Sequence, residues 1–284
     1  IPIQDPFTGD TTEAYLFVAV LPCSCYAYAE ACADMTSGQW LSCHANAYSY
    51  FGGVTRLLLP DNLKTGVVKN TRYETILNRS YQELAEYYDT AIVPARIYHP
   101  KDKSLVEGTV KYASTWISAA LRNRRFFSIA EVKKAVSEKL KELNHFPFKK
   151  REGNRHRAYY EEEHDFMKPL PFTPYEPAIW STARVPRDYL ISDGKNKFSV
   201  PFDLIGEDVD IRLTEKTVEV FFHGSRVASH PRSAAQLREP VVRFEHMPLA
   251  HQKYLSYSAE EFQAWAGSVG EQTSTVIKLF LAAG

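Results

Sequence analysis

The chain has 284 residues, and its 34 Lys and Arg balance its 34 Asp and Glu, so the formal net charge is zero. Overall charge therefore does not indicate a polyanionic partner, and such a role would depend on local charge. A hydrophobic content of 44% predicts a sizeable core and two or three domains. No apolar run reaches the roughly 18 residues of a bilayer span, and no secretory leader is present, so we expect a soluble, cytoplasmic protein without a membrane partner.

The first part of the chain alternates strand-like and helical patterns. Ile1–Ile3 and the apolar run Ala14–Val20 flank the turn-forming segment Asp5–Asp10, which predicts a hairpin. Tyr26–Ala33 is a third strand. A helix follows, capped by Thr36 or Ser37 and ended by the two glycines at 52 and 53.

The next strand ends at an acidic residue. Val54–Leu59 is nearly all apolar, which predicts a strand covered on both faces, and Pro60 ends its pairing just before Asp61. Asp61 is therefore expected at the carboxyl edge of a sheet. A helix around Tyr81–Tyr88 and a fifth strand, Thr90–Ile97, complete this region.

A second acid, Glu107, lies on an amphipathic helix. Lys103, Glu107 and Lys111 recur four residues apart on an exposed line. The apolar stripe predicted to be buried beside that line consists of Val106, Val110, Ala113, Ile117 and Ala120.

Asp61 and Glu107 are the candidate catalytic and metal-binding residues. Carboxylates shared between two divalent cations are what metal-dependent phosphoryl transfer needs, and hard oxygen ligands suit Mg²⁺ or Mn²⁺. Lys101, Lys103 and Lys111 are candidate contacts to DNA phosphates. The alternative is an ordinary strand-end aspartate and a row of surface ion pairs on the helix.

The middle of the chain is basic. Between Arg96 and Lys168 there are 17 Lys and Arg against 10 Asp and Glu. Solvated surface faces are the alternative to DNA binding for this excess. The predicted DNA contacts here are Arg122, Arg124, Arg125, Lys149, Lys150 and Arg151. A helix is expected over Ser128–Leu143, and the prolines of segment 169–174 indicate a linker.

Short alternating strands follow the linker and predict a small barrel. They are Ala178–Ala183, Tyr189–Ser192, Lys197–Phe202, Val209–Leu213 and Val218–Phe222. Arg184, Arg187, Lys195 and Lys197 are its candidate phosphate contacts, although surface solubility explains them equally well. Helical periodicity returns over Ser258–Ala283.

The remaining metal-binding residue types indicate no site. Cys23, Cys25, Cys32 and Cys43 lack the paired spacing of a zinc site, and we expect them to be reduced core residues. The nine histidines form no ligand set, and His145, His156 and His164 are expected on the surface.

The order of elements is that of an α/β, RNase H-like domain. We expect a catalytic core at 1–125 with a mixed five-stranded sheet and a truncated first strand, and a helical and basic linker at 126–174. A small DNA-binding β-barrel at 175–233 and a C-terminal helical segment at 234–284 follow.

Four stretches carry a family resemblance along nearly the whole chain. They are Leu16–Leu21 with Tyr26–Ala31, then Leu59–Lys64, His99–Gly108, and His246–Leu255. These stretches resemble IstA-type insertion-sequence transposases of the DDE integrase superfamily. The Pro-Lys-Asp-Lys-x-x-Val-Glu-Gly element ending at Gly108 is the most specific.

The resemblance implies an RNase H-like integrase core followed by an SH3-like barrel. It matches Asp61 and Glu107 to the second and third catalytic acids, and it places the first aspartate before Ile1, so we expect this fragment to be inactive by itself. The implied reaction is Mg²⁺- or Mn²⁺-dependent cleavage at transposon ends, with two ions, and strand transfer of the 3′-hydroxyl into target DNA.

The same resemblance implies several partners and a region absent from this chain. The expected partners are transposon-end DNA, target DNA, an IstB-type AAA+ ATPase, and at least one further copy of the chain. An upstream DNA-binding region is expected to be missing. The rival interpretation is a non-catalytic DNA-binding or assembly module that uses the RNase H-like fold as a scaffold.

Overall fold

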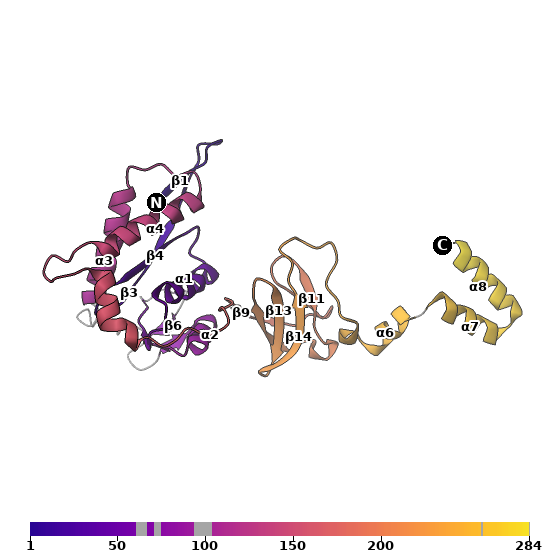
Figure 1. Ribbon diagram of the computed structural model, residues 1–284. Helices are drawn as coiled ribbons and strands as arrows, with labels where there is room; N and C mark the ends of the chain where they lie inside the picture. The colour runs from indigo at the N-terminus through magenta and orange to yellow at the C-terminus, as the bar shows by residue number, and fades with distance from the viewer. Residues whose placement is uncertain (61–66, 71–74, 94–103, 257, 284) are drawn as a thin grey trace. The chain divides into compact units, whose positions relative to one another are not determined.

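The computed structural model describes residues 1–60, 67–70, 75–93, 104–256 and 258–283 (Figure 1). Its contacts divide the chain into two compact units, Ile1–Ile179 and Trp180–Gly284, here called unit 1 and unit 2. Helices and β-sheets occur together in unit 1, so the expected α/β class is confirmed.

An antiparallel pair of strands forms the centre of unit 1. Strand β3 (Tyr15–Val20) pairs with β4 (Ala27–Cys32), with Val18 opposite Ala29. The chain begins with a separate hairpin, in which β1 (Pro2–Gln4) pairs with β2 (Thr11–Glu13). The expected pairing of Ile1–Ile3 with Ala14–Val20 is therefore wrong. The hairpin closes earlier because Asp5 Oδ1 accepts the backbone N–H groups of Phe7 and Thr8 and so forms a compact turn.

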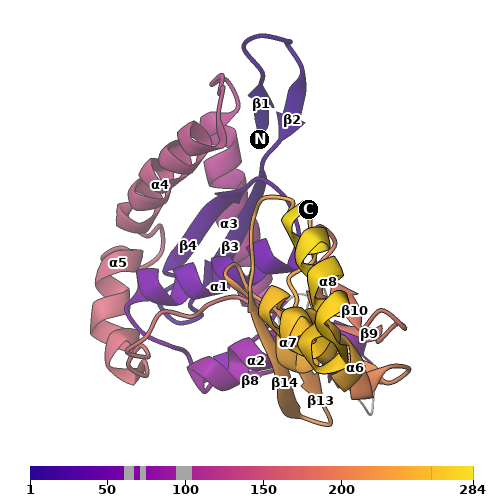
Figure 2. The ribbon, with the colours of Figure 1, turned by 90° about the vertical axis from the view of Figure 1, so that its right-hand side faces the viewer.

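Helices cover both faces of the β3–β4 pair (Figure 2). On one face, the alanines at 27, 29 and 31 of β4 pack against α3 (Ser104–Leu121) and α4 (Ile129–His145). Alanine side chains are short, so the helices approach the sheet closely. On the other face lies α1 (Ser37–Phe51), which begins where Thr36 accepts the Gln39 N–H and ends at Gly52 with φ of 73°.

A second core in unit 1 surrounds a short parallel ladder. Strand β5 (Leu57–Leu58) pairs with β8 (Ala91–Ile92), and α2 (Arg79–Tyr88) packs nearby. The expected strand at 54–59 is shorter and less covered than predicted, because its ladder with β8 spans only two residues. Leu57 and Leu59 remain 55% and 46% exposed.

Two further backbone pairings involve residues before and after β5 in the sequence. Val54 forms an isolated bridge with Lys168. A Cβ at Gly53 would lie 2.7 Å from the Met167 Cβ, so only glycine fits this approach. Strands β6 (Val67–Asn70) and β7 (Thr75–Leu77) form an antiparallel hairpin that the sequence pattern did not indicate. Residues 94–97 of the predicted fifth strand lie outside the described part of the chain.

The segment expected to be a linker packs into unit 1. Helix α4 buries Val132, Val136 and Leu140 in the core it shares with β4. The chain continues through α5 (Arg155–Ala158), the π-helical turn η2 (Tyr159–Glu163) and the 3-10 turn η3 (His164–Phe166). Tyr159 is buried, and its hydroxyl donates to the Phe51 carbonyl. The boundaries at 125, 174 and 233 stay predictions, but residues 126–174 share the packing of unit 1.

Unit 2 contains a four-stranded sheet with the order β14-β13-β12-β9 and a separate hairpin, β10-β11. These strands enclose a core around Phe198, Val209 and Val220. The sequence analysis missed β14, which follows a turn at His223 and Gly224 with φ of 48° and 79°. The bounds are β9 (Ile179–Arg184), β10 (Leu190–Ser192), β11 (Lys197–Ser199), β12 (Asp208–Leu213), β13 (Thr217–Phe222) and β14 (Ser225–Pro231). An SH3-like arrangement stays a prediction.

Short helical segments follow in unit 2. The 3-10 turns are η4 (Phe202–Leu204) and η5 (Phe244–His246), and α6 spans Leu249–Ser256. The expected helix at 258–283 is two helices, α7 (Ala259–Val269) and α8 (Glu271–Ala283), separated at Gly270. Ser258 and Glu261 form a capping box that starts α7. Among the described helices, none combines the length and apolar content needed to cross a membrane.

Candidate functional site

Glu107 lies in the first turn of α3, and its side chain is exposed. A carboxylate at this position interacts favourably with the partial positive charge of a helix N-terminus. Lys111, one turn later, is also exposed, as the sequence pattern predicts. Asp61, Lys101 and Lys103 lie outside the described residues. The pairing of Asp61 with Glu107 therefore stays a prediction.

The buried stripe of α3 differs in part from the predicted one. Ala113 and Ile117 are buried as expected, and Leu121 continues the four-residue spacing. Ala120 is exposed instead, because it lies beside that line near the end of the helix. Val110 is half-buried, and the side chain of Val106 lies outside the description. The line beside this stripe, with Glu107 and Lys111, is exposed to solvent.

Within the described part of the chain, no three His, Cys, Asp or Glu side chains gather into a possible metal site. Of the two candidate catalytic carboxylates, Glu107 is the one whose position the structure gives. It offers the hard oxygen donor that Mg²⁺ or Mn²⁺ prefers.

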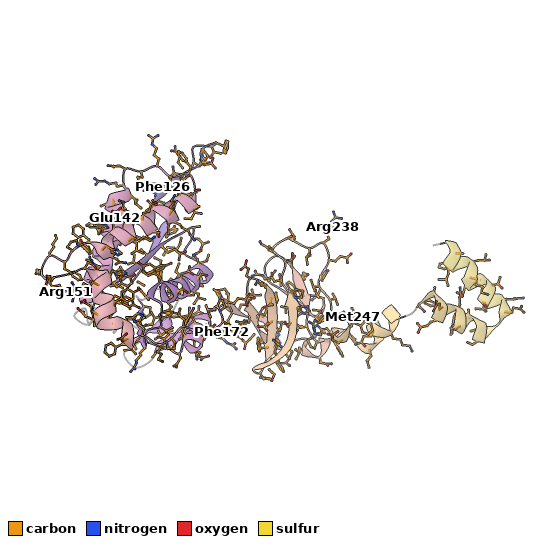
Figure 3. All side chains as sticks on the ribbon, viewed as in Figure 1. Phe126, Glu142, Arg151, Phe172, Arg238 and Met247 are labelled. Atoms are coloured by element: carbon orange, nitrogen blue, oxygen red, sulfur yellow. The ribbon has the colours of Figure 1, made fainter. Side chains whose placement is uncertain are left out.

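The basic residues after α3 and those after α4 form separate groups. Arg122, Arg124 and Arg125 follow the end of α3 and are exposed, and Arg124 lies 3.9 Å from the Glu138 carboxylate. Figure 3 shows Phe126, which follows this group, well apart from Arg151 on the loop after α4. The two groups therefore do not make one continuous contact.

Lys149, Lys150 and Arg151 line an open pocket together with aromatic side chains. The pocket has a volume of about 610 Å³. Its other lining residues come from the turn after β3, from α3, and from the loop between α4 and α5: Pro22, Cys23, Cys25, Tyr112, Phe146, Pro147, Phe148 and Arg155. The sequence analysis selected only the three cations. Phe146 and Phe148 directly precede the basic run 149–151, and this neighbourhood was the sequence signal for aromatic residues beside the cations.

Arg155 anchors this pocket from inside. It is buried, its Nη1 donates to the Leu143 carbonyl at 3.1 Å, and its guanidinium carbon lies 5.2 Å from the Tyr112 ring centroid. Its Nε is buried and has no hydrogen-bond partner among the described residues. Arg155 thus presents a desolvated cation with one unused donor.

The predicted phosphate contacts of unit 2 are all exposed, but two already have protein partners. Arg184 donates from Nε to the Gly206 carbonyl at 3.0 Å, and Lys197 lies 3.8 Å from an Asp188 carboxylate oxygen. Arg187 and Lys195 are exposed beside them in sequence. DNA contact by these four residues stays a prediction.

Two buried histidines in unit 2 are structural. The Ser199 hydroxyl lies 2.8 Å from His246 Nδ1, and His230 Nε2 lies 2.7 Å from the Ser199 carbonyl oxygen. Burial lowers the pKa of both imidazoles. His246, which belongs to one of the family-like stretches, therefore holds the segment after β14 against the core of unit 2.

The cysteines are free, but they are not all in the core. Cys32 and Cys43 are buried, with their sulfur atoms 3.2 Å apart between β4 and α1. Cys23 is exposed, so its expected burial is wrong. The reason is local: the turn after β3 is held from outside the core by Glu163, which accepts the N–H groups of Cys23 and Ser24.

A family model matches the later part of the chain. Residues 170–241 match the model of the Mu transposase, C-terminal domain. This range covers all strands of unit 2.

Curated relatives extend that similarity to nearly the whole chain. The y4bL/y4kJ/y4tB protein of Sinorhizobium fredii, named as a transposase, is 37% identical over 98% of this chain and 54% of its own length. A protein of Burkholderia multivorans, named as a transposase for insertion sequence IS408, is 36% identical over 99% of this chain and 54% of its own length. The transposase for insertion sequence element IS21 of Pseudomonas aeruginosa is 30% identical over 72% of this chain and 55% of its own length.

The chain is thus similar to insertion-sequence transposases along nearly its whole length, and the resemblance drawn from its motifs is confirmed. The chain spans about half the length of the curated relatives it matches.

Solved structures show a weaker likeness. The catalytic core domain of BIV integrase is 19% identical, with a TM-score of 0.40, over 58% of this chain and 94% of that one. The HTLV-2 integrase catalytic core domain, in complex with magnesium, gives a TM-score of 0.39 at 16% identity. The match covers 56% of this chain and 90% of that one. Scores of this size do not decide the fold, so the RNase H-like arrangement stays a prediction.

Proposed function

We propose that the chain is the catalytic and end-binding part of a DNA transposase, which cleaves transposon ends and transfers the 3′-hydroxyl into target DNA. The observation that carries this proposal is the similarity to insertion-sequence transposases along 98% of the chain. The exposed position of Glu107 in the first turn of α3, with Lys111 one turn away, supports it.

In this proposal Asp61 and Glu107 hold divalent cations, which supply activation of the attacking oxygen and stabilisation of the leaving oxygen. Lys111 receives a phosphate of the scissile strand, because a lysine one helical turn from a metal-binding carboxylate lies within reach of the same backbone. The basic residues of unit 2 hold the transposon end. An ATPase partner of the IstB type and assembly of at least two copies on DNA belong to the same proposal.

The test is a strand-transfer assay of the complete protein with a transposon-end duplex and Mg²⁺. Asp61→Asn and Glu107→Gln are each expected to lower strand transfer by about a thousandfold or more, because each removes a carboxylate ligand. Glu142→Gln is the matched control, since Glu142 is an exposed acid on α4 (Figure 3). Unchanged strand transfer in the Asp61 and Glu107 variants would instead favour a non-catalytic assembly module.

A further inference from the structure

We propose that the pocket between α3, the turn after β3 and the loop 146–155 binds an unpaired nucleotide of a DNA strand. The base stacks on the aromatic side chains, and the adjacent phosphates contact the basic rim. This inference rests on the proposed function, since it names the form of DNA that the basic loop recognises. The pocket volume of about 610 Å³ lies within the range of small-molecule sites.

The aromatic side of the pocket is partly open to solvent. Tyr112 and Phe146 are 37% and 42% exposed. Behind them, Trp116 lies 5.0 Å from the Phe146 ring and 6.1 Å from the Tyr112 ring, between ring centroids. These contacts hold the rings in place before a ligand arrives. A preformed aromatic surface of this kind stacks a base regardless of its identity.

The cationic side of the pocket distinguishes a nucleotide from a neutral apolar ligand. Arg151 stacks over Phe148 at 4.1 Å, and Arg155 lies 5.4 Å from the same ring centroid. Arg155 lines the pocket, and its buried Nε has no hydrogen-bond partner among the described residues. Lys149 and Lys150 are exposed at the rim, where they face solvent and any approaching phosphate.

Nearby carboxylates are largely committed to other contacts. Glu162 accepts two hydrogen bonds from Arg151, at 3.1 and 3.3 Å. Glu163 accepts the N–H groups of Cys23 and Ser24. The pocket therefore keeps an excess of positive charge from Lys149, Lys150 and Arg155, which favours an anionic ligand.

The pocket shares helix α3 with the candidate catalytic carboxylate. Tyr112 follows Glu107 by five residues on α3, which is a rise of about 7.5 Å along the helix. The Thr109 hydroxyl contacts the Cys25 sulfur at 3.7 Å, so the turn after β3 touches the same stretch of α3. Unpaired nucleotides are the form of DNA whose base faces are free to stack here.

The test compares two duplexes of the same sequence, one blunt and one with a three-nucleotide overhang containing 2-aminopurine, in buffer without divalent metal. The chain is expected to bind the overhang duplex about tenfold more tightly and to quench the 2-aminopurine fluorescence. The double variant Tyr112→Ala/Phe146→Ala should lose both the preference and the quenching. Phe127→Ala is the control, because Phe127 is similarly exposed and does not line the pocket.

A charge variant tests the rim separately. Lys149→Gln/Lys150→Gln is expected to weaken overhang binding and to reduce the slope of log affinity against log salt by about two. Lys134→Gln/Lys141→Gln removes the same charge from exposed positions of α4 and should leave the preference for the overhang unchanged. Equal affinity of the unmodified chain for both duplexes would overturn the inference, as would a preference that survives in the aromatic double variant.

The outcome is separable from that of the proposed function. Binding is measured without metal and does not require Glu107, so Glu107→Gln should keep the overhang preference. If that preference is present while strand transfer is unaffected by Asp61→Asn and Glu107→Gln, only the proposed reaction fails. If strand transfer depends on both acids while the two duplexes bind equally, only the pocket assignment fails.

Discussion

The guanidinium carbon of Arg155 lies 5.2 Å from the ring centroid of Tyr112, so a residue that begins α5 packs on the helix that carries Glu107. The same guanidinium donates to the carbonyl of Leu143 in the last turn of α4. One buried side chain therefore joins three helices around the proposed nucleotide pocket.

Arg155→Lys keeps the charge but loses the flat guanidinium that makes both contacts. We expect the free energy of unfolding of the chain to fall by about 1–2 kcal/mol, because the buried Leu143 carbonyl loses one of its two donors and keeps only the Phe146 N–H. Urea unfolding at neutral pH measures this change. Arg157→Lys is the control: Arg157 is exposed and pairs with Glu161 four residues on, so its variant should leave the free energy of unfolding nearly unchanged.

His44 makes the stability of unit 1 depend on pH. Burial lowers the pKa of its imidazole from 6.5 to about 4. Between these values the unfolded chain binds the proton and the folded chain does not, so stability is complete above about pH 6.5 and falls as the pH drops toward 4. The loss from this group is up to about 3 kcal/mol. Below pH 4 both states are protonated, and this contribution changes no further.

The measurement is urea unfolding at pH 7, 5.5 and 4.5. His44→Phe should show a shallower decline with falling pH than the unmodified chain. His164→Phe, at an exposed position, should keep the original slope. Identical slopes in all three proteins would mean that His44 takes up its proton in the folded state.

Glu30 ties three elements of unit 1 together. Its carboxylate accepts hydrogen bonds from Tyr28 on the same strand at 2.8 Å, from Asn46 on α1 at 2.9 Å and from Lys133 on α4 at 3.1 Å. Burial raises the pKa of this carboxyl, but these three donors together lower it below its usual value. Its contribution is therefore present at neutral pH and is lost as the pH falls through the lowered pKa.

Glu30→Gln is expected to lower the free energy of unfolding at pH 7 by about 1–3 kcal/mol, since the charged acceptor is lost. The difference from the unmodified chain should shrink when urea unfolding is repeated below the pKa of Glu30. Glu138→Gln removes a more exposed carboxylate, 3.9 Å from Arg124, and serves as the reference. A loss no greater than that of the reference would contradict the assigned role of Glu30.

The cysteines should divide into two classes of reactivity. Cys23 is exposed, whereas Cys32 and Cys43 are buried. Iodoacetamide should therefore modify Cys23 in the folded chain and reach Cys32 and Cys43 only after unfolding. Burial, together with the charge of Glu163, raises the pKa of the Cys23 thiol, so its labelling should accelerate steadily as the pH rises above 8. Peptide mass spectrometry after timed labelling distinguishes the sites, and early modification of Cys43 would contradict this packing.

Local signals predicted most helices and several strands. The Thr36 cap and the glycine at 52 set the limits of α1, and the short alternating runs of unit 2 matched five of its strands closely. Strand β14 was missed because its signal is a His-Gly turn rather than a strong apolar alternation. The extent of unit 1 was not predictable from local pattern, since the prolines near 169–174 looked like a boundary while Tyr159 and Lys168 pack back onto α1 and Val54.

The candidate site was predictable only in part. A carboxylate at Glu107 on an exposed helix line followed from its spacing, and the structure places it there. The pocket around Arg155 did not follow, because its members come from three separate segments and only their packing brings them together. A charge count finds Lys149–Arg151, but it says nothing of the aromatic rings beside them.

Asn144 joins the end of α4 to strand β4 through two side-chain hydrogen bonds. Its side-chain oxygen accepts the Ala27 N–H at 3.1 Å, and its side-chain nitrogen donates to the Ala27 carbonyl at 2.8 Å. The Asn144 amide therefore substitutes for a neighbouring strand at one residue of β4. Asn144 lies two positions before Phe146, where the loop that bears the pocket begins. Hydrogen exchange at the Ala27 amide therefore reports on that loop from a distance. A ligand that orders the loop should slow this exchange without contacting Ala27.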